Sequence, residues 1–570
     1  MSSATRQPLF QNGGTPAKIL LALALLAMTL PWLNPFSPGP TPAVMPFLFS
    51  WLCIIGTAGV LVWAHRRGQG RAMVRVVALA WVAAASISAG IGLLQYFGAT
   101  GWAGRWLNHT ELGQAFGNLR QRNQFATLLA IGLAALLWWA AQIQPTTDAP
   151  DAPDAPDAPD ALDALDALDA PDAPDALDAT VQPLAGKPSR ALKLMLLLAA
   201  ALLAAGNAAS SSRTGLLQLA LLAWLTWLWQ RQPARANPSR MSLSLVHQVL
   251  ISALVSYVVA TLALPLLAGL DPFGSGAWVR LRDGDAACSS RLTLWGNVLH
   301  LIAQKPWLGW GWGELDYAHF ITLYPGTRFC DILDNAHNLP LHLAVELGVP
   351  LALLACGATA GLVWRAKPWR ETAAQRQLAW SLLAVVGLHS LLEYPLWYGP
   401  FQMAVLLALW LLLSPPQPSH LRQSYKLFSP LALYLYGIAA IFLVAFIAYT
   451  AWNYQLASQI YLPPNERLTA YREDTLEKIS QVALFQDQVR FAQLTTTELD
   501  ANNAHQVHAL ALDVLHFSPE AQVLELLLDS ARMLGKSDEV IYFSLRYQAA
   551  FAQAYTLWAT KAPMPCAICN

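Results

Sequence analysis

Eleven apolar runs separated by polar loops constrain the fold of this 570-residue chain more than any other feature. A helix needs about 20 mostly apolar residues to cross the hydrocarbon core of a bilayer. Only 12% of the residues are charged, whereas a soluble domain carries roughly 25%. We therefore expect an all-α polytopic membrane protein with about 11 transmembrane helices, in a range of about 10 to 13. The runs are 19–33, 44–64, 74–97, 125–143, 191–207, 214–229, 245–269, 339–364, 378–397, 400–414 and 431–452. The first, fifth, sixth and tenth are short enough to be tilted or re-entrant instead.

Basic residues mark every second loop between these runs. They are Arg66, Arg67, Arg71, Arg231, Arg235, Arg240, Arg365, Lys367, Arg370, Arg376, Arg422 and Lys426. Lys and Arg accumulate in cytoplasmic loops, so loops 98–124, 208–213 and 270–338 and the tail after Trp452 are expected to face the periplasm. The first run ends at Asn34-Pro35 without a small-residue cleavage site, and we expect no cleavable signal peptide. The predicted location is the bacterial inner membrane.

Residues 148–178 repeat Asp-Ala-Pro and Asp-Ala-Leu with a period of three. Frequent Pro and a like charge at every third residue oppose both a helix and a packed core. We interpret the segment as a disordered acidic spacer in a cytoplasmic loop, and a docking site is the alternative.

The tail 453–570 has a different pattern from the runs before it. It reads as short amphipathic helices, one of which is expected to start at Ser518-Pro519-Glu520 with Ser as its N-cap. Two domains follow: a transmembrane domain over 1–452 and a periplasmic α-helical domain over 453–570. The tail also resembles one tetratricopeptide hairpin, although such arrays usually need about three units.

Two pairs of cysteines fall outside the apolar runs. Cys288 and Cys330 lie in the same outward loop, and an oxidising compartment would allow a disulfide between them. Cys566 and Cys569 end the chain as a lone C-x-x-C, which favours a local disulfide or no function over a redox or metal role. The nearest acidic pair in an outward loop is Asp283 with Asp285, and we expect no metal and no cofactor.

Polar residues gather on the outward loops and at the outer ends of the runs, where charge is less costly than at membrane depth. Four clusters stand out: 117–124, 210–215, 270–338 and 389–395. Arginine forks suit phosphate and diphosphate groups, indole faces suit sugar rings, and histidine suits proton transfer near neutral pH. Together they suggest a sugar linked to a lipid diphosphate, whose anomeric carbon is attacked by an acceptor hydroxyl.

Each of these residues also has a structural interpretation. Arg120 and Arg122 can be interface anchors, and Arg291 can cap a short surface helix over 291–304. The histidine–glutamate pairs His342/Glu346 and His389/Glu393 are four residues apart, as structural pairs on one helix face are. The Trp-Gly run 307–313 is better explained as a shaped loop than as a catalytic element.

Five segments, in order, resemble the O-antigen ligase and polymerase superfamily, and within it the bacterial protein O-oligosaccharyltransferases of the PglL type. They are GNLRQRNQFATLL at 117–129, SSSRTGLL at 210–217, SRLTLWGNVLHLIAQKPWLGWGWG at 290–313, DNAHNLPLHLAVELG at 334–348 and HSLLEYPLWYGPF at 389–401. Residues 453–570 are similar to the extra C-terminal region of that subgroup.

The resemblance implies the site residues. His337 corresponds to the essential histidine of the long periplasmic loop, and Arg213 and Arg291 to arginines that engage the diphosphate. The remaining candidates bind substrate: Asn118, Arg120, Gln121, Arg122, Asn123, Asn338, Glu393 and Tyr394. The implied activity is transfer of a preassembled oligosaccharide from undecaprenyl diphosphate to Ser or Thr hydroxyls of periplasmic proteins such as pilin, with the lipid bilayer as a further partner and no nucleic acid.

Three rival functions share this sequence pattern. An O-antigen ligase would transfer the same glycan to lipid A-core, and a polymerase would join repeat units. A transporter of lipid-linked glycan would carry charged residues through the whole depth of its pore. The charges here lie at the outer edge, which favours an enzyme.

Overall fold

The computed structural model describes residues 15–34, 43–67, 69–119, 121–143, 189–231, 244–274, 276, 279, 282, 284, 287–414, 430–480 and 482–561. Within these ranges the chain forms helices and no strand, as expected. The acidic tract 148–178, Arg120, the pair Asp283/Asp285 and the terminal cysteines lie outside the described residues. The α-helices are α1 (Thr15–Leu33), α2 (Val44–Arg66), α3 (Gly70–Tyr96), α4 (Arg122–Gln142), α5 (Arg190–Ser210), α6 (Arg213–Gln230), α7 (Leu245–Leu267), α9 (Arg291–Gln304), α10 (Leu315–Ile321), α11 (Leu339–Leu347), α12 (Val349–Ala366), α13 (Ala374–Ser390), α14 (Gly399–Leu413), α15 (Pro430–Ser458), α16 (Thr475–Ile479), α17 (Gln486–Thr496), α18 (Ala504–Val514), α19 (Ala521–Met533), α20 (Ser537–Ala550) and α21 (Ala552–Lys561).

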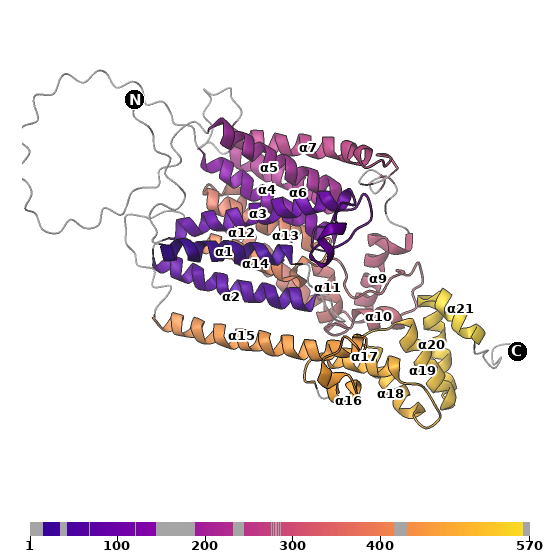
Figure 1. Ribbon diagram of the computed structural model, residues 1–570. Helices are drawn as coiled ribbons and strands as arrows, with labels where there is room; N and C mark the ends of the chain where they lie inside the picture. Colours follow the sequence, from indigo (N-terminus) through magenta and orange to yellow (C-terminus); the bar gives the residue numbers. More distant parts are fainter. Residues whose placement is uncertain are drawn as a thin grey trace, which may run out of the picture.

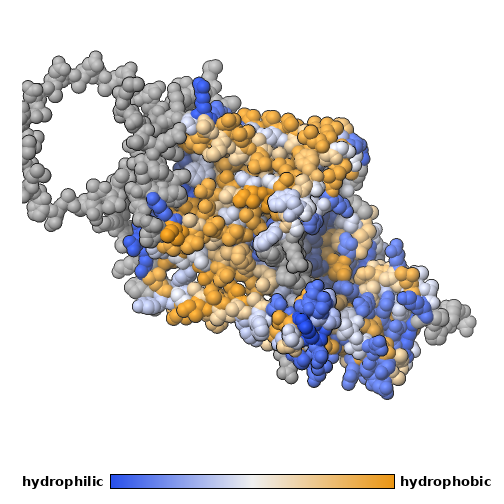
Figure 2. Space-filling view, in the orientation of Figure 1, coloured by the Kyte–Doolittle hydropathy of each residue, from blue (hydrophilic) through white to orange (hydrophobic). Residues whose placement is uncertain are grey.

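Seven of the described helices are long and apolar enough to cross a membrane: α2, α3, α4, α5, α7, α12 and α15. The apolar helices α1 and α14 are shorter, and α6 and α13 also coincide with expected spans. A helix therefore stands at each of the eleven apolar runs, while the number of spans, about 11, stays a prediction. The face of this bundle seen in Figure 2 is predominantly apolar, as expected for a protein surrounded by lipid.

Helix α4 lies at the centre of the bundle and packs against α3, α5 and α13. Small residues allow this close packing. A Cβ atom at Gly132 would overlap the Cβ of Ala85 on α3, and Gly206 on α5 faces Ala89 and Leu129. Backbones in membrane bundles approach most closely where both partners are small. The centre of the bundle thus positions the start of α4, which carries two of the predicted site residues.

The eighth apolar run is two helices, so the expected single span over 339–364 is wrong. Gly348 separates α11 from α12 with φ 89°, and an added Cβ there would overlap the carbonyl oxygen of Trp307. The backbone N–H of Val349 donates to the carbonyl oxygen of Pro306 at 2.8 Å. Because the loop before α10 packs directly on this break, only α12 has the length and composition of a span.

The long loop and the tail form one packed unit at one end of the bundle (Figure 1). Phe320 on α10 is 1% exposed and belongs to the same apolar core as Leu494, Leu524 and Leu527 of the tail. Arg546 on α20 donates to the carbonyl oxygen of Ile321 at 2.7 Å. The tail is helical as expected, but its similarity to a tetratricopeptide hairpin and the division at 452 stay predictions.

Two local expectations in these segments have different outcomes. Cys288 and Cys330 are joined by a disulfide with a Cα–Cα distance of 5.3 Å. The predicted helix start at Ser518 is wrong, since α19 begins at Ala521 after the cap residue Glu520. The Ser518 hydroxyl donates to the Glu520 carboxylate at 2.8 Å instead of capping the helix by accepting from one of its N–H groups.

Candidate active site

Glu393 is the centre of a polar cluster at one end of the bundle. It lies in the turn between α13 and the short helix η5 (Pro395–Trp397) and is only 2% exposed. Four side chains from three other segments donate hydrogen bonds to its carboxylate. They are Gln121 Nε2 at 3.3 Å, Asn123 Nδ2 at 3.1 Å, His337 Nδ1 at 2.5 Å and an Arg291 guanidinium nitrogen.

These contacts keep the Glu393 carboxylate charged. Burial alone raises the pKa of a carboxyl group because a low-dielectric surrounding disfavours the anion. The hydrogen bond from His337 and the charge of Arg291 outweigh that effect, and the pKa of Glu393 lies below its usual 4.5. An ionised carboxylate only accepts hydrogen bonds, so His337 must donate its Nδ1–H.

His337 is held in place by backbone and side-chain contacts. Its backbone has φ 49°, an uncommon value for a residue other than glycine, and its N–H donates to Asn335 Oδ1 at 2.9 Å. The Tyr394 ring packs edge-on against the imidazole with centroids 5.0 Å apart. The next residue, Asn338, caps α11 and donates to the carbonyl oxygen of Leu391 at 3.0 Å. The histidine loop and the turn of Glu393 are thereby tied together.

The start of α6 joins the cluster through Asn123. Ser212 donates to Asn123 Oδ1 at 2.7 Å, and its oxygen caps α6 by accepting from the N–H of Gly215. Arg213 is the first residue of α6. The arginine therefore directly follows a residue that is bonded to a partner of Glu393.

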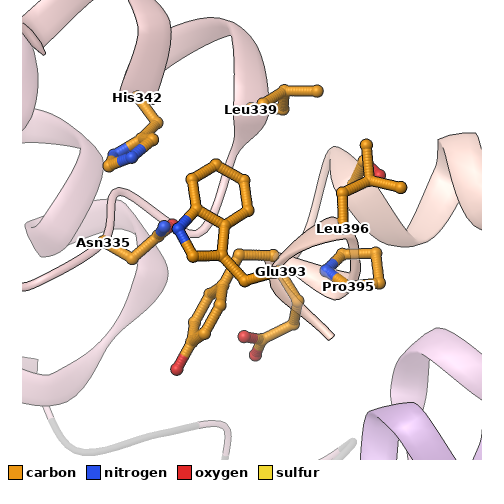
Figure 3. A pocket seen from close by; sticks show the side chains of 9 residues that line it. Asn335, Leu339, His342, Glu393, Pro395 and Leu396 are labelled. Atoms are coloured by element: carbon orange, nitrogen blue, oxygen red, sulfur yellow. The ribbon is translucent and has the colours of Figure 1, made fainter. Parts of the chain in front are cut away.

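A small, narrow hollow lies beside Glu393, and Figure 3 shows Asn335, His342 and Glu393 among the side chains that line it. Its lining comes from the loop before α11, from α11 itself and from the turn through η5. The lining residues are Asn335, Leu339, His342, Ser390, Glu393, Tyr394, Pro395, Leu396 and Trp397.

The structure brings most predicted site residues together, but two lie apart. Asn118 uses its amide to hold a loop, donating to the carbonyl oxygens of Leu33 and Trp106 at 2.9 and 3.0 Å. Arg122 places its guanidinium 5.5 Å from the ring centroid of Phe116. Of the two predicted helix pairs, His342 and Glu346 do lie together, with His342 Nε2 3.5 Å from a Glu346 carboxyl oxygen.

The predicted pairing of His389 with the Glu393 side chain is wrong. Helix α13 ends at Ser390, so the two side chains do not share a helix face. His389 Nδ1 instead bonds the Thr127 hydroxyl at 2.9 Å, and Glu393 turns toward His337.

The Trp-Gly run 307–313 is a shaped loop, as predicted, but the sequence analysis missed that Trp312 and Trp397 meet beside the hollow. Among the residues with described positions, no group of three His, Cys, Asp or Glu side chains is arranged to hold a metal.

Three family models match separate parts of the chain. Residues 115–140 match the Protein glycosylation ligase model, residues 198–356 the O-Antigen ligase model, and residues 377–564 the model of the Virulence factor membrane-bound polymerase, C-terminal. Together they contain Gln121, Asn123, Arg291, His337 and Glu393, so the polar cluster draws on all three matched regions. These matches confirm the resemblance to the O-antigen ligases and protein glycosylation ligases.

One relative in the comparison with known proteins carries the name of an enzyme. A General O-oligosaccharyltransferase of Acinetobacter baylyi (strain ATCC 33305 / BD413 / ADP1) is 32% identical over 123 residues. The alignment spans 21% of this chain and 21% of that relative. No solved structure matches the chain.

Proposed function

We propose that this protein transfers a preassembled oligosaccharide from undecaprenyl diphosphate to Ser or Thr hydroxyls of periplasmic proteins such as pilin, at the periplasmic face of the inner membrane. The observation that carries the proposal is the hydrogen bond of His337 Nδ1 to the buried Glu393 carboxylate beside Arg291. A histidine oriented by a carboxylate is the usual arrangement for removing a proton from a hydroxyl nucleophile.

The His337–Glu393 contact fixes which imidazole nitrogen acts. Because Nδ1 carries the proton donated to Glu393, Nε2 of the neutral ring is the acceptor nitrogen. Nε2 takes the proton of the acceptor hydroxyl as its oxygen forms the new bond to the anomeric carbon. The Glu393 carboxylate stabilises the imidazolium that results. A single displacement of this kind inverts the configuration of the sugar.

The arginines stabilise the leaving group. When the bond from the anomeric carbon to the phosphate oxygen breaks, undecaprenyl diphosphate departs as an anion. The Arg291 side chain is 32% exposed and contacts Glu393 through one terminal nitrogen. A guanidinium has five N–H donors, so the others are available for a diphosphate oxygen. Arg213 is the second diphosphate ligand in this mechanism.

The test is expression in a host that supplies undecaprenyl-linked glycan. The wild type should add the glycan to pilin or other periplasmic proteins, detected by mass spectrometry, and His337→Ala should abolish the modification while inserting normally into the membrane. His109→Ala, at an exposed histidine of another outward loop, is the matched control and should transfer normally. Retained transfer by His337→Ala removes this residue from the mechanism.

The O-antigen ligase match at 198–356 favours one rival, transfer to lipid A-core. A lipopolysaccharide gel run beside the mass spectrometry separates the two. Glycan on lipopolysaccharide and none on protein would replace the proposal with that rival, and longer glycan chains without either acceptor would indicate a polymerase.

A further inference from the structure

Four aromatic rings form a row that starts at His337. Its imidazole meets the Tyr394 ring at a centroid distance of 5.0 Å, and Tyr394 meets Trp397 at 6.4 Å. Trp397 and Trp312 are then nearly parallel, with an angle of 10° and centroids 6.2 Å apart. The row leads from the proposed proton acceptor to indoles that are 36% (Trp397) and 63% (Trp312) exposed.

The position of Trp312 is fixed by its backbone rather than by burial. The N–H groups of Trp310 and Gly311 donate to carbonyl oxygens of α11 at 2.8 and 3.0 Å. Gly309 and Gly313 both have positive φ, and a Cβ at Gly309 would overlap the backbone of Glu346. An exposed indole is thus held on a tightly packed loop, which is the arrangement of a preorganised binding surface.

His342 holds the two indoles from the side. Its ring stands edge-on to Trp397 at 5.2 Å and to Trp312 at 6.1 Å. His342 itself is 3% exposed and is paired with Glu346. The parallel indoles therefore present a supported aromatic surface next to the hollow beside Glu393.

We propose that this surface binds sugar rings of the donor beyond the one that reacts. The inference rests on the proposed function, which places the reacting anomeric carbon near His337. The apolar C–H face of a sugar stacks on an indole, and its hydroxyls need polar partners. Asn335, Ser390 and Glu393 line the adjoining hollow but are at most 6% exposed, so solvent supplies these partners at the exposed indole face.

The proposal predicts that the contribution of Trp312 depends on glycan length. Two donors share undecaprenyl diphosphate and are paired with the same acceptor protein; one carries a single sugar and the other an oligosaccharide. Trp312→Leu should raise KM for the oligosaccharide donor roughly two- to tenfold, the size of one aromatic contact, and leave KM for the single-sugar donor unchanged. Trp312→Phe, which keeps a flat ring, should recover most of the loss. Trp102→Leu, at an indole of another outward loop that is 79% exposed, is the control.

A binding measurement separates this proposal from the proposed function. Saturation-transfer NMR with the free oligosaccharide should show contact with the wild type and a weakened signal with Trp312→Leu, whether or not transfer occurs. An equal KM increase for both donors would assign Trp312 to the lipid, the diphosphate or the acceptor and overturn the proposal. Unchanged KM and unchanged NMR signal would overturn it as well. Absence of transfer by the wild type, with intact glycan binding, would overturn only the proposed function.

Discussion

Glu393 remains an anion although its side chain is almost completely buried. A buried charge is tolerated when it is paired and hydrogen-bonded, and Glu393 receives bonds from Gln121, Asn123, Arg291 and His337. Removing the charge leaves Arg291 and His337 without the group that orients them. The carboxylate thus determines both the shape of the cluster and the tautomer of the histidine.

Replacement of this carboxylate by its neutral isostere tests that role. We expect Glu393→Gln to reduce the rate of glycan transfer about 100-fold or more, because the imidazolium loses its stabilising charge. The rate is measured with purified protein in a transfer assay. Glu111→Gln, at an exposed carboxylate that bonds Gln114, is the control, and a rate close to that of the wild type for Glu393→Gln would contradict the mechanism.

The lowered pKa of Glu393 also predicts a pH dependence of stability. A carboxylate whose pKa is lower in the folded state than in the unfolded state stabilises the fold above the unfolded pKa, about 4.5. That contribution is lost as the pH falls from about 4.5 through the lower folded value. The melting temperature of detergent-solubilised wild type should therefore exceed that of Glu393→Gln most at neutral pH, and the difference should shrink below pH 4.5. A constant difference would show that Glu393 is not charged in the fold.

The outward polar clusters predicted the region of the site from the sequence, and the resemblance assigned roles to its residues. The motifs predicted Arg291, His337 and Glu393 as site residues, but helix spacing paired Glu393 with His389 incorrectly because the end of α13 was not visible in an apolar run. The contact of Trp312 with Trp397 joins two loops that are distant in sequence. Such contacts depend on how α11 packs, which no local pattern encodes.

At the scale of elements, Gly348 decides the geometry of the site. The sequence is apolar on both sides of Gly348, which is why it predicted a single span over 339–364. The break arises because the backbone at Pro306 and Trp307 approaches too closely for any side chain at position 348. Helix α11 is thereby released from α12 and carries His342 to the aromatic row.

We expect Gly348→Ala to destabilise the protein by about 2–4 kcal/mol, from the positive φ and the overlap with Trp307. Thermal unfolding in detergent measures the loss. Gly361→Ala is the matched control because Gly361 lies in the same helix, α12, and a Cβ added there meets only open space. The melting temperature of this control variant should be unchanged or slightly higher. Equal behaviour of the two variants would show that the close approach is absent.

At the scale of the whole molecule, the apolar runs predicted where helices form, but not how many of them span the bilayer. By length and composition, seven of the described helices can cross a bilayer, and α1, α6, α13 and α14 are not among them. The periodicity of the tail predicted helices, yet it did not show that the tail shares a core with the long loop.

The acidic tract 148–178 lies in the connection between α4 and α5, two helices at the centre of the bundle. Helices α4 and α5 pack against each other directly, and the polar cluster uses residues at the opposite end of α4. Deletion of 148–178 should therefore leave glycan transfer nearly unchanged, measured by mass spectrometry of the acceptor. A Gly-Ser linker of equal length in its place serves as the control. A large loss on deletion, with recovery by the linker, would show that the length of the loop matters.

The core that Phe320 shares with the tail sets an order of events during synthesis. Helix α10 leaves the ribosome long before Leu524 and Leu527 exist, and its apolar face stays uncovered until α19 has been made. Nascent chains that stop short of α19 therefore leave this face uncovered, and uncovered apolar surface is prone to aggregation. The packed unit of long loop and tail is consequently completed only in the last stretch of translation.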